Sequence, residues 1–513
     1  MIRLFIICGF YLLSVTLFAQ KFDFQWLYGT FKVNGDNTEI SNILIDFNEQ
    51  PAQLNEVNDV DVQFYFQRTA IADKNGDLAF MSDGCRVYDR FGNIMANGDT
   101  LNPGGVFDIY CDEVAGWDTS PGGRQSMFAL PQPGNDSIWY LFHISYAIDP
   151  DITTQFLYYS IINTNRNNGL GEVIEKNVIL DNLPEFGKMN VAYSADLSSW
   201  FIVSAEWESD RYDVFILDSV GVIFHQQQSI GEVTPDGSGA GYSTRFSPDG
   251  TVYAVYNHLT GLEVFDFDRV TGSLSNARFV PETRNQDSLD WGGLEFSPSG
   301  RYLYLASGHF LDQFDLEAPT LEEGRVRVAN MEALEGEFFQ PIFAQLQLGP
   351  DCRLYNFMLS GRYVHIIHRP DEAGTACMVE QRAWETPSHY FRGAPLYPKY
   401  RMRALGDTSS ICDHVTATIF TSLQETEEES PVQAYLYPNP AITETRVVLE
   451  TKVRELRYEL YDFQGRRVLE GRRDKLPAGV ALRLDLRGLA KGTYVLRLTD
   501  ARGRRWSERV MKQ

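Results

Sequence analysis

Short stretches in which apolar and polar residues alternate run through most of the chain, and each ends in turn-forming residues. Tyr302-Leu-Tyr-Leu305, for example, follows the turn Ser297-Pro-Ser-Gly300. A period of two with aromatic and aliphatic residues predicts strands, while Pro and Gly predict tight turns. The aromatic content of 13% agrees, because aromatic rings pack well on a pleated surface. We therefore expect an all-β protein.

One turn-and-strand unit recurs every 50 to 53 residues. It is found in Tyr193-Ser-Ala-Asp-Leu197, Phe246-Ser-Pro-Asp-Gly250, Phe296-Ser-Pro-Ser-Gly300 and Leu348-Gly-Pro-Asp-Cys352. A period of about 40–50 residues with strand patterning is typical of β-propeller blades. The body is therefore predicted to be a β-propeller, and its repeats resemble those of WD40/YVTN-like propellers.

The repeats also predict a blade number. Units centre near residues 75, 136, 196, 248, 298 and 351, and residues 389–414 supply a further one. We expect residues 22–28 to pair with this last blade, because such pairing removes an exposed sheet edge. Seven blades are the prediction, and six are the alternative.

The N-terminus is typical of a cleavable signal peptide. Arg3 supplies a positive charge, Leu4–Phe18 form an apolar segment, and Ala19 offers a small residue at the cleavage site. The apolar segment is short for a membrane-spanning helix, which needs about 20 residues. We predict residues 1–19 as signal peptide, with no transmembrane segment after its cleavage.

Charge divides the rest of the chain. The protein carries a net charge of −24, but residues 431–513 carry 18 Lys+Arg against 10 Asp+Glu, so the preceding residues carry −32. An acidic body excludes nucleic acid as its partner, because phosphate binding requires a basic surface. We predict a propeller over 20–420, an acidic linker over 421–433, and a small Ig-like β-sandwich over 434–513.

The last eighty or so residues closely resemble the type A sorting domain of the type IX secretion system. The resemblance rests on Tyr437-Pro-Asn-Pro-Ala441, Leu460-Tyr-Asp-Phe-Gln-Gly465, Leu489-Ala-Lys-Gly-Thr-Tyr494 and a basic last strand ending near Lys512. An ordinary Ig-like adhesion module would share the fold and lack the sorting role. The resemblance implies a sorting signal that comprises Pro438, Asn439, Pro440, Gly465, Gly492, Tyr494 and Lys512.

That resemblance also implies a route. The chain is expected to cross the periplasm, to be handled by the type IX machinery at the outer membrane, and to be secreted or held at the cell surface. Attachment to surface lipopolysaccharide is one implied outcome, and cleavage in the exposed acidic linker is expected. The body resembles propeller-like proteins that carry this tail, and Arg269-Val-Thr-Gly-Ser-Leu274 resembles a stretch of lactonase-type propellers.

Five cysteines follow the signal peptide, so at least one has no intramolecular partner. The economical disulfides are Cys85 with Cys111 and Cys352 with Cys377, which leaves Cys412. Export makes such bonds permissible.

Motifs for catalysis or cofactors are scarce. HExxH, GxSxG and phosphate-binding loops are missing, and Gly237-Ser-Gly-Ala-Gly241 precedes a strand rather than a helix. Asp73, Asn75 and Asp77 space oxygen ligands as a calcium loop does, but Gly84 replaces its twelfth-position Glu, so a tight turn is favoured over calcium. No cofactor is expected.

Two further groups of polar residues were considered. His365 and His368 point to opposite sides of a predicted strand and so do not share a metal. An acidic loop beside an aromatic residue could bind sugar or supply an acid/base pair, although a solvated loop is favoured; it contains Asp112, Glu113, Trp117 and Asp118.

The sequence as a whole favours a non-enzymatic surface or secreted propeller that binds a protein or glycan partner through its loops. A lactonase-like or other hydrolase is the second hypothesis, and it requires titratable side chains that converge at the channel mouth. A structural component of the surface layer or motility machinery is the third, and it requires a large exposed apolar patch.

Overall fold

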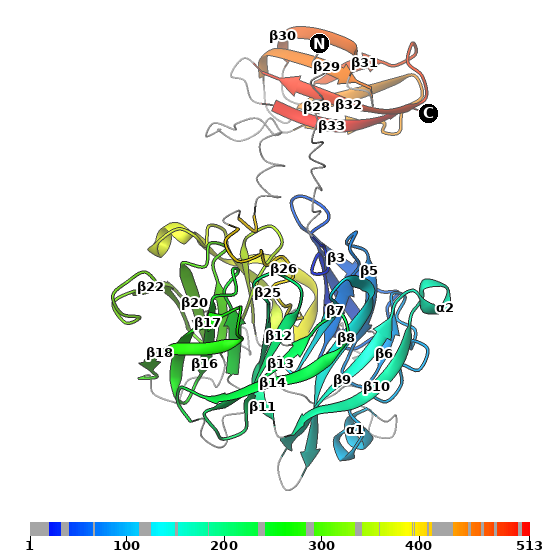
Figure 1. The fold of residues 1–513 in the computed structure, drawn as a ribbon. Coiled ribbons are helices and arrows are strands. Elements are labelled where there is room, and N and C mark those ends of the chain that lie inside the picture. The colour runs from blue at the N-terminus through cyan, green and yellow to red at the C-terminus, as the bar shows by residue number, and fades with distance from the viewer. Residues whose placement is uncertain are drawn as a thin grey trace, which may run out of the picture. The chain divides into compact units, whose positions relative to one another are not determined.

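The computed structural model describes most of the chain after the first 19 residues. The described ranges are 20–31, 40–64, 67–111, 125–148, 152–182, 184–233, 242–283, 292–333, 341–358, 360–391, 393, 395–407, 410–412, 434–449, 453–462, 466–476, 480–500 and 505–512. The chain divides into two compact units, Met1–Ala417 and Thr418–Gln513. Each unit is all-β and is described by itself (Figure 1).

The first unit is a series of small antiparallel sheets in which each strand pairs with its neighbour in sequence. Two three-stranded sheets come first; their strands are β1 (Gln25–Phe31), β2 (Ile40–Asp46) and β3 (Gln53–Val57), then β4 (Thr69–Ala72), β5 (Leu78–Ser82) and β6 (Val87–Asp89). The next is four-stranded and consists of β7 (Met127–Gln132), β8 (Asn135–Ile148), β9 (Ile152–Asn163) and β10 (Glu172–Asn182).

Four-stranded sheets also form the rest of this unit. Their strands are β11 (Pro184–Tyr193), β12 (Trp200–Glu206), β13 (Arg211–Leu217) and β14 (Val222–Ser229); β15 (Tyr242–Phe246), β16 (Val252–Asn257), β17 (Gly261–Asp268) and β18 (Ser273–Pro281); β19 (Gly292–Phe296), β20 (Tyr302–Ser307), β21 (Phe310–Asp315) and β22 (Arg325–Asn330); and β23 (Gln345–Leu348), β24 (Leu354–Phe357), β25 (Ser360–Ile367) and β26 (Val379–Phe391).

The recurring turn joins the first two strands of each of the last four sheets. Its final residue has a positive φ in every copy: 63° at Leu197, 71° at Gly250, 78° at Gly300 and 65° at Cys352. Glycine adopts this conformation without a Cβ clash, yet only two of the four copies use glycine. The turn geometry therefore repeats more strictly than the sequence does.

Apolar residues between neighbouring sheets build the core. One cluster joins the β11–β14 sheet to the β15–β18 sheet, a second joins the latter to the β19–β22 sheet, and a third joins that one to the β23–β26 sheet. The largest cluster brings the first sheet onto the last: the Trp26 ring lies 5.4 Å from Tyr355, and Tyr28 lies 5.5 Å from Phe357. Sheets that pack face to face in a closed series are the blades of a β-propeller.

The ring closes differently from the prediction. Strands β1, β2 and β3 form a sheet of their own, which closes the ring by side-chain packing. The predicted pairing of residues 22–28 with the last blade is wrong, because β1 pairs with β2. Residues 389–414 are not a blade either. Strand β26 ends at Phe391 as the outer strand of the last sheet, and the chain then turns toward the axis.

Residues 395–407, here called the central segment, cross the middle of the ring. The Tyr400 hydroxyl donates to Ala129 O in β7 (2.6 Å), and the Tyr397 hydroxyl donates to Gln25 O in β1 (3.0 Å). The Leu405 amide donates to Ala195 O beyond β11 (2.8 Å). Contact with strands from distant sheets is possible only near the axis, so this segment fills one end of the channel.

The described residues form two disulfides. Cys85 bonds to Cys111, as the sequence predicted, with the two Cα atoms 5.5 Å apart. The predicted bond between Cys352 and Cys377 is wrong: Cys352 bonds instead to Cys412, whose Cα lies 6.0 Å away. Cys377 is a buried free thiol packed in the core between the last two blades. Proximity in sequence misled the prediction, because Cys412, which follows the central segment, lies beside the turn before β24.

Helices are few and short. They are α1 (Gly105–Tyr110), α2 (Arg166–Gly169) and the 3₁₀ turn η1 (Gly374–Cys377). In the described part of the chain, none is long or apolar enough to span a bilayer.

The second unit contains two antiparallel sheets with a shared core. One sheet has the order β27-β28-β31, from β27 (Ala434–Tyr437), β28 (Glu444–Leu449) and β31 (Ala481–Asp485). The other has the order β30-β29-β32-β33, from β29 (Val453–Tyr461), β30 (Arg467–Leu476), β32 (Gly492–Thr499) and β33 (Arg505–Lys512). Alternate residues such as Leu482, Leu484, Leu496 and Leu498 point into this core, as a two-sheet packing requires.

Candidate functional site

A buried cluster of charged side chains surrounds Glu295 near the axis. This carboxylate is fully buried on β19 and forms ion pairs with Lys399 of the central segment and with Arg245 of β15. Its two oxygens also accept the amides of Phe296 (2.9 Å) and Leu348 (3.0 Å). Burial lowers the pKa of Lys399 below its usual value, and the negative charge of Glu295 opposes that shift.

A second ion pair lies in the same region. Arg401 contacts the buried Asp23 carboxylate at 3.1 Å and also donates to Pro350 O at 3.3 Å. The cavity that reaches Asp23, Lys399 and Arg401 measures about 10 Å³, which holds one water molecule at most. These charges therefore bind each other and the backbone, and a substrate has no room among them.

Arg269 belongs to the stretch that resembles lactonase propellers, and it too is used internally. Its guanidinium is buried and donates to the carbonyl oxygens of Tyr193 (2.8 Å), Ser194 (2.9 Å) and Asp249 (2.6 Å). It thus ties the recurring turns of two adjacent blades together. The role of Arg269 in joining two blades therefore explains why an arginine stands at this position of the stretch Arg269–Leu274.

A buried Ser–His–Asn arrangement was missed in the sequence because its members are far apart. His143 Nδ1 lies 2.6 Å from Asn102 Oδ1, and His143 Nε2 lies 2.9 Å from Ser160 Oγ. Burial lowers the pKa of His143 to about 3, so the imidazole is neutral. The Ser160 hydroxyl also accepts the Asn177 amide (3.1 Å) and is fully buried. Because His143 and Ser160 are fully buried and Asn102 is only 8% exposed, the arrangement is a structural network.

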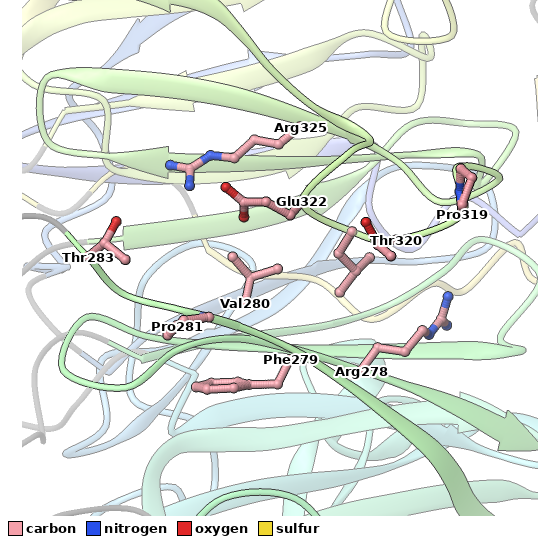
Figure 2. A pocket seen from close by; sticks show the side chains of 10 residues that line it. Arg278, Phe279, Val280, Pro281, Thr283, Pro319, Thr320, Glu322 and Arg325 are labelled. Carbon is pink, nitrogen blue, oxygen red and sulfur yellow. The ribbon is translucent and has the colours of Figure 1, made fainter.

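An open groove lies on the outer side of the propeller, between neighbouring blades. A groove of about 500 Å³ separates the end of β18 from the turn before β22 (Figure 2). Its apolar side consists of Val280 and Leu321, which are both buried, and of the partly exposed Phe279 ring. Polar groups surround it: Arg278, Thr283, Thr320, Glu322 and Arg325. An apolar floor with a few polar groups is typical of a ligand-binding site.

Ion pairs within each blade position the two arginines of this groove. Arg278 bonds to Asp266 of β17 (2.9 Å), and Arg325 bonds to the buried Asp312 of β21 (2.8 Å). In Figure 2 the two guanidiniums lie on different sides of the groove, with Val280 between them. Sequence reasoning missed the groove, because Phe279 and Leu321 come together only when two blades pack.

The structure gathers most of the predicted sorting residues at one edge of the second unit. Asn439 Nδ2 donates to Arg509 O (2.6 Å), and the Met511 amide donates to Asn439 Oδ1 (2.8 Å). Lys512 forms a bridge with Ala441 and lies opposite Gly492 in the β32–β33 register. Pro438 and Pro440 flank Asn439. Through the hydrogen bonds of Asn439, the segment that follows β27 is bound to the last strand, β33.

One member of the predicted signal lies elsewhere. Tyr494 is buried in the core of the unit, and its hydroxyl donates to Ala490 O (2.7 Å). Gly465 lies outside the described residues, as do the signal peptide, the linker 421–433, the stretch from Asp112 to Asp118 and Gly237–Gly241.

The candidate metal ligands are used within the protein. Asp73 Oδ1 accepts the amides of Asn75 (2.7 Å), Gly76 (3.0 Å) and Asp77 (3.2 Å), which makes a tight turn. His365 is buried, whereas His368 contacts Glu380 at 2.7 Å on the exposed side of the strand. Among the described residues, no three His, Cys, Asp or Glu side chains gather around a possible metal position.

Blades around a plugged axis, followed by a separate two-sheet unit, define this chain as a propeller with a C-terminal accessory domain. Residues 435–513 match the family described as secretion system C-terminal sorting domain. The chain therefore carries a type IX sorting domain and is delivered through the periplasm to the cell surface.

Solved structures were compared as well. A protein from Lactobacillus plantarum is 14% identical with a TM-score of 0.41, covering 72% of this chain and 98% of its own. The Pseudomonas aeruginosa periplasmic gluconolactonase PpgL is 14% identical with a TM-score of 0.37, covering 73% and 99%. The Swd1 β-propeller domain of Myceliophteria thermophila is 11% identical with a TM-score of 0.34, covering 65% and 93%. We draw no conclusion on activity from such distant structures. Among curated proteins, none matches this chain.

Proposed function

We propose that the propeller is a non-enzymatic binding protein of the cell surface and that the groove beside Phe279 holds its protein or glycan partner. The observation that carries the proposal is the contrast between two places in the body. The cavity among Asp23, Lys399 and Arg401 offers only about 10 Å³, whereas the groove between blades is open and offers about 500 Å³.

The chemistry of the groove suits recognition. The Phe279 ring is 41% exposed, and an exposed aromatic ring can stack on a sugar ring or on an apolar side chain of a protein. The hydroxyls of Thr283 and Thr320 and the charged ends of Glu322 and Arg325 supply hydrogen bonds around it. A few fixed polar groups around an apolar surface give orientation and specificity.

A hydrolase would require titratable groups that converge in an accessible place. Two candidate arrangements, around Glu295 and around His143, are both buried. Binding is therefore the function that the described residues support best.

Export and processing complete the proposal. Residues 1–19 are removed as a signal peptide, residues 20–420 act as the binding body, and residues 434–513 are recognised for secretion. The tail is cut away within the acidic linker 421–433, and the body is released or joined to surface lipopolysaccharide.

The test compares two phenylalanines on outer strands. The purified full chain is applied to an array of immobilised oligosaccharides and to an array of immobilised secreted proteins. We expect Phe279→Ala to weaken binding of the best probe about tenfold, or about 1.4 kcal/mol. Phe224→Ala removes a ring that is 57% exposed on β14 and should leave binding unchanged. Equal affinities for wild type and Phe279→Ala would refute the groove as the site.

A further inference from the structure

The outer face of the β30-β29-β32-β33 sheet combines exposed apolar residues with arginines. Val495 and Met511 point away from the core and are 45% and 42% exposed, although their neighbours Tyr494, Leu496 and Val510 are buried. In the strand register, Val495 lies between Tyr461 and Arg509, and Met511 lies opposite Thr493. The side of the sheet that faces away from the core is thus partly apolar.

Charges surround this apolar strip unevenly. Arg467 and Arg457 both contact Glu459 at 2.8 Å, so carboxylates balance these two guanidiniums. Arg497 instead lies over the Tyr461 ring, 5.3 Å from its centre. Within the described part of the chain, neither Arg497 nor Arg509 forms an ion pair, and both are exposed. We call the surface made by Tyr461, Val495, Arg497, Arg509 and Met511 the arginine face.

The sorting residues hold this face in place. Asn439 bonds to the backbone of Arg509 and Met511 through its side-chain amide, and the Ala441 amide donates to Met511 O (2.7 Å). These bonds occupy the open edge of β33 beside the exposed side chains. Asn439 is therefore a positioning residue for the arginine face.

We infer that the arginine face is the surface through which the sorting domain docks on a protein of the secretion machinery, one whose own surface is apolar in the middle and acidic at its edge. This inference rests on delivery by the type IX route. Arginine, tyrosine and methionine beside an apolar residue are the side chains enriched in protein–protein interfaces. Unpaired guanidiniums at the edge fit carboxylates of a partner.

A lipopolysaccharide phosphate suits this face less well. Glu459 and Glu470 lie among the arginines and would repel a phosphate group. Exposed Val495 and Met511 offer nothing to a phosphate, yet they gain from contact with an apolar protein surface. The composition of the face thus favours a protein as its occupant.

The test reverses the two unpaired charges in the full chain, in a bacterium that has a type IX system. We expect the double variant Arg497→Glu, Arg509→Glu to lower the surface-exposed fraction at least tenfold, with protein retained in the periplasm. Whole-cell protease shaving and cell fractionation measure this. The variant Arg497→Lys, Arg509→Lys keeps the charge and should export within threefold of wild type. Thermal unfolding of the purified variants shows whether the second unit is still folded.

A matched control carries the same change of charge elsewhere. Arg473→Glu, Lys475→Glu alters two exposed cations of β30, of which Arg473 lies in register with Leu456, far from Val495. It should export as wild type does. Wild-type export of the Arg497→Glu, Arg509→Glu variant would overturn the inference, and so would equal loss in the control.

Two further measurements distinguish failure of this inference from failure of delivery by the type IX route. Vesicles of purified lipopolysaccharide are tested for binding to the wild-type chain and the double variant. If the double variant loses both vesicle binding and export, the face binds lipid and the inference is overturned. If it loses export while its vesicle binding is unchanged, the inference is supported. If a chain without residues 434–513 still reaches the surface, delivery by this tail is itself wrong. If only that truncation blocks export, the tail is needed but the arginine face is not the docking surface.

Discussion

Lys399 and Glu295 form an ion pair across the centre of the propeller, although 104 residues separate them in sequence. Glu295 projects from the strand β19, and Lys399 arrives from the segment that follows the last blade. Because Glu295 is fully buried and the Lys399 side chain is only 9% exposed, the pair joins this segment to the ring at a place that is largely shielded from water. This ion pair belongs to the contact between the central segment and the ring at the end of the channel that the segment fills.

Lys399→Met should therefore destabilise the body strongly. Removal of the Lys399 ammonium leaves Glu295 with Arg245 as its ion-pair partner and takes away one hydrogen bond between charged groups, which typically contributes about 1.5–3 kcal/mol. We expect the urea midpoint of the first unit to fall accordingly. Arg301→Met removes a partner of the exposed pair with Asp315, and exposed pairs contribute little. A midpoint for Lys399→Met no lower than that of Arg301→Met would contradict the role assigned to the pair.

The bond between Cys352 and Cys412 should fix the end of the same segment. It closes 60 residues, and the chain-entropy relation gives roughly 4 kcal/mol for a loop of that length. The double variant Cys352→Ser, Cys412→Ser should lower the melting temperature of the oxidised protein. Cys377→Ser removes only a free thiol and should leave the two disulfides intact.

Peptide mapping without reduction checks the connectivity directly. We expect linked peptides that contain Cys85 with Cys111 and Cys352 with Cys412. Cys377 should react with an alkylating reagent only after unfolding, because it is buried. A linked peptide of Cys352 with Cys377 would show that the pairing described here is wrong.

The contribution of Asp181 to the stability of the body should fall as the pH rises from about 4 to about 7. Burial, together with the neighbouring carboxylate of Asp213, raises the pKa of Asp181 to about 7, whereas an aspartate in an unfolded chain has a pKa of about 3.9. The folded state thus binds an extra proton between these values, and its advantage disappears as the pH rises through 7. Burial raises the pKa of Asp83 to about 6 and acts in the same direction.

Melting temperatures at pH 5 and pH 8 measure this effect. We expect Asp181→Asn to reduce the difference between the two values, because the amide does not titrate. Asp210→Asn, in the turn before β13, should leave the difference unchanged. An identical pH dependence in wild type and Asp181→Asn would exclude Asp181 as its source.

Asn439→Ala should loosen the last strand of the sorting domain. It removes the two side-chain hydrogen bonds to the backbone of β33, each worth about 1 kcal/mol. Hydrogen exchange at the Met511 amide should become faster. Ile442→Ala changes a neighbouring exposed residue and should leave that exchange rate as in wild type. An unchanged exchange rate of the Met511 amide in Asn439→Ala would show that the Asn439 side chain does not hold β33 in place.

Local chemistry made several features readable in the sequence. The two-residue period predicted strands because successive side chains of a strand point to opposite faces. The turn from Phe246 to Gly250 and its relatives predicted blades because the same turn recurs at a blade-sized interval. The motifs around Asn439 and Tyr494 identified the sorting domain, because they are short and contiguous. Cys85 and Cys111 lie within a single neighbouring stretch, so spacing also predicted their bond.

Contacts between distant segments were decided only by the tertiary structure. The pairing of Cys352 with Cys412 and the ion pair of Glu295 with Lys399 depend on the path of residues 395–412, and a segment without periodicity gives no sign of its path. Closure of the ring by packing Trp26 on Tyr355 follows from the shapes of two blades. The groove beside Phe279 exists only where two blades meet, and the arginine face exists only once β33 lies beside β32. Sequence periodicity reports which side of a strand is buried, whereas the partner that covers or leaves open each side is chosen by the global packing.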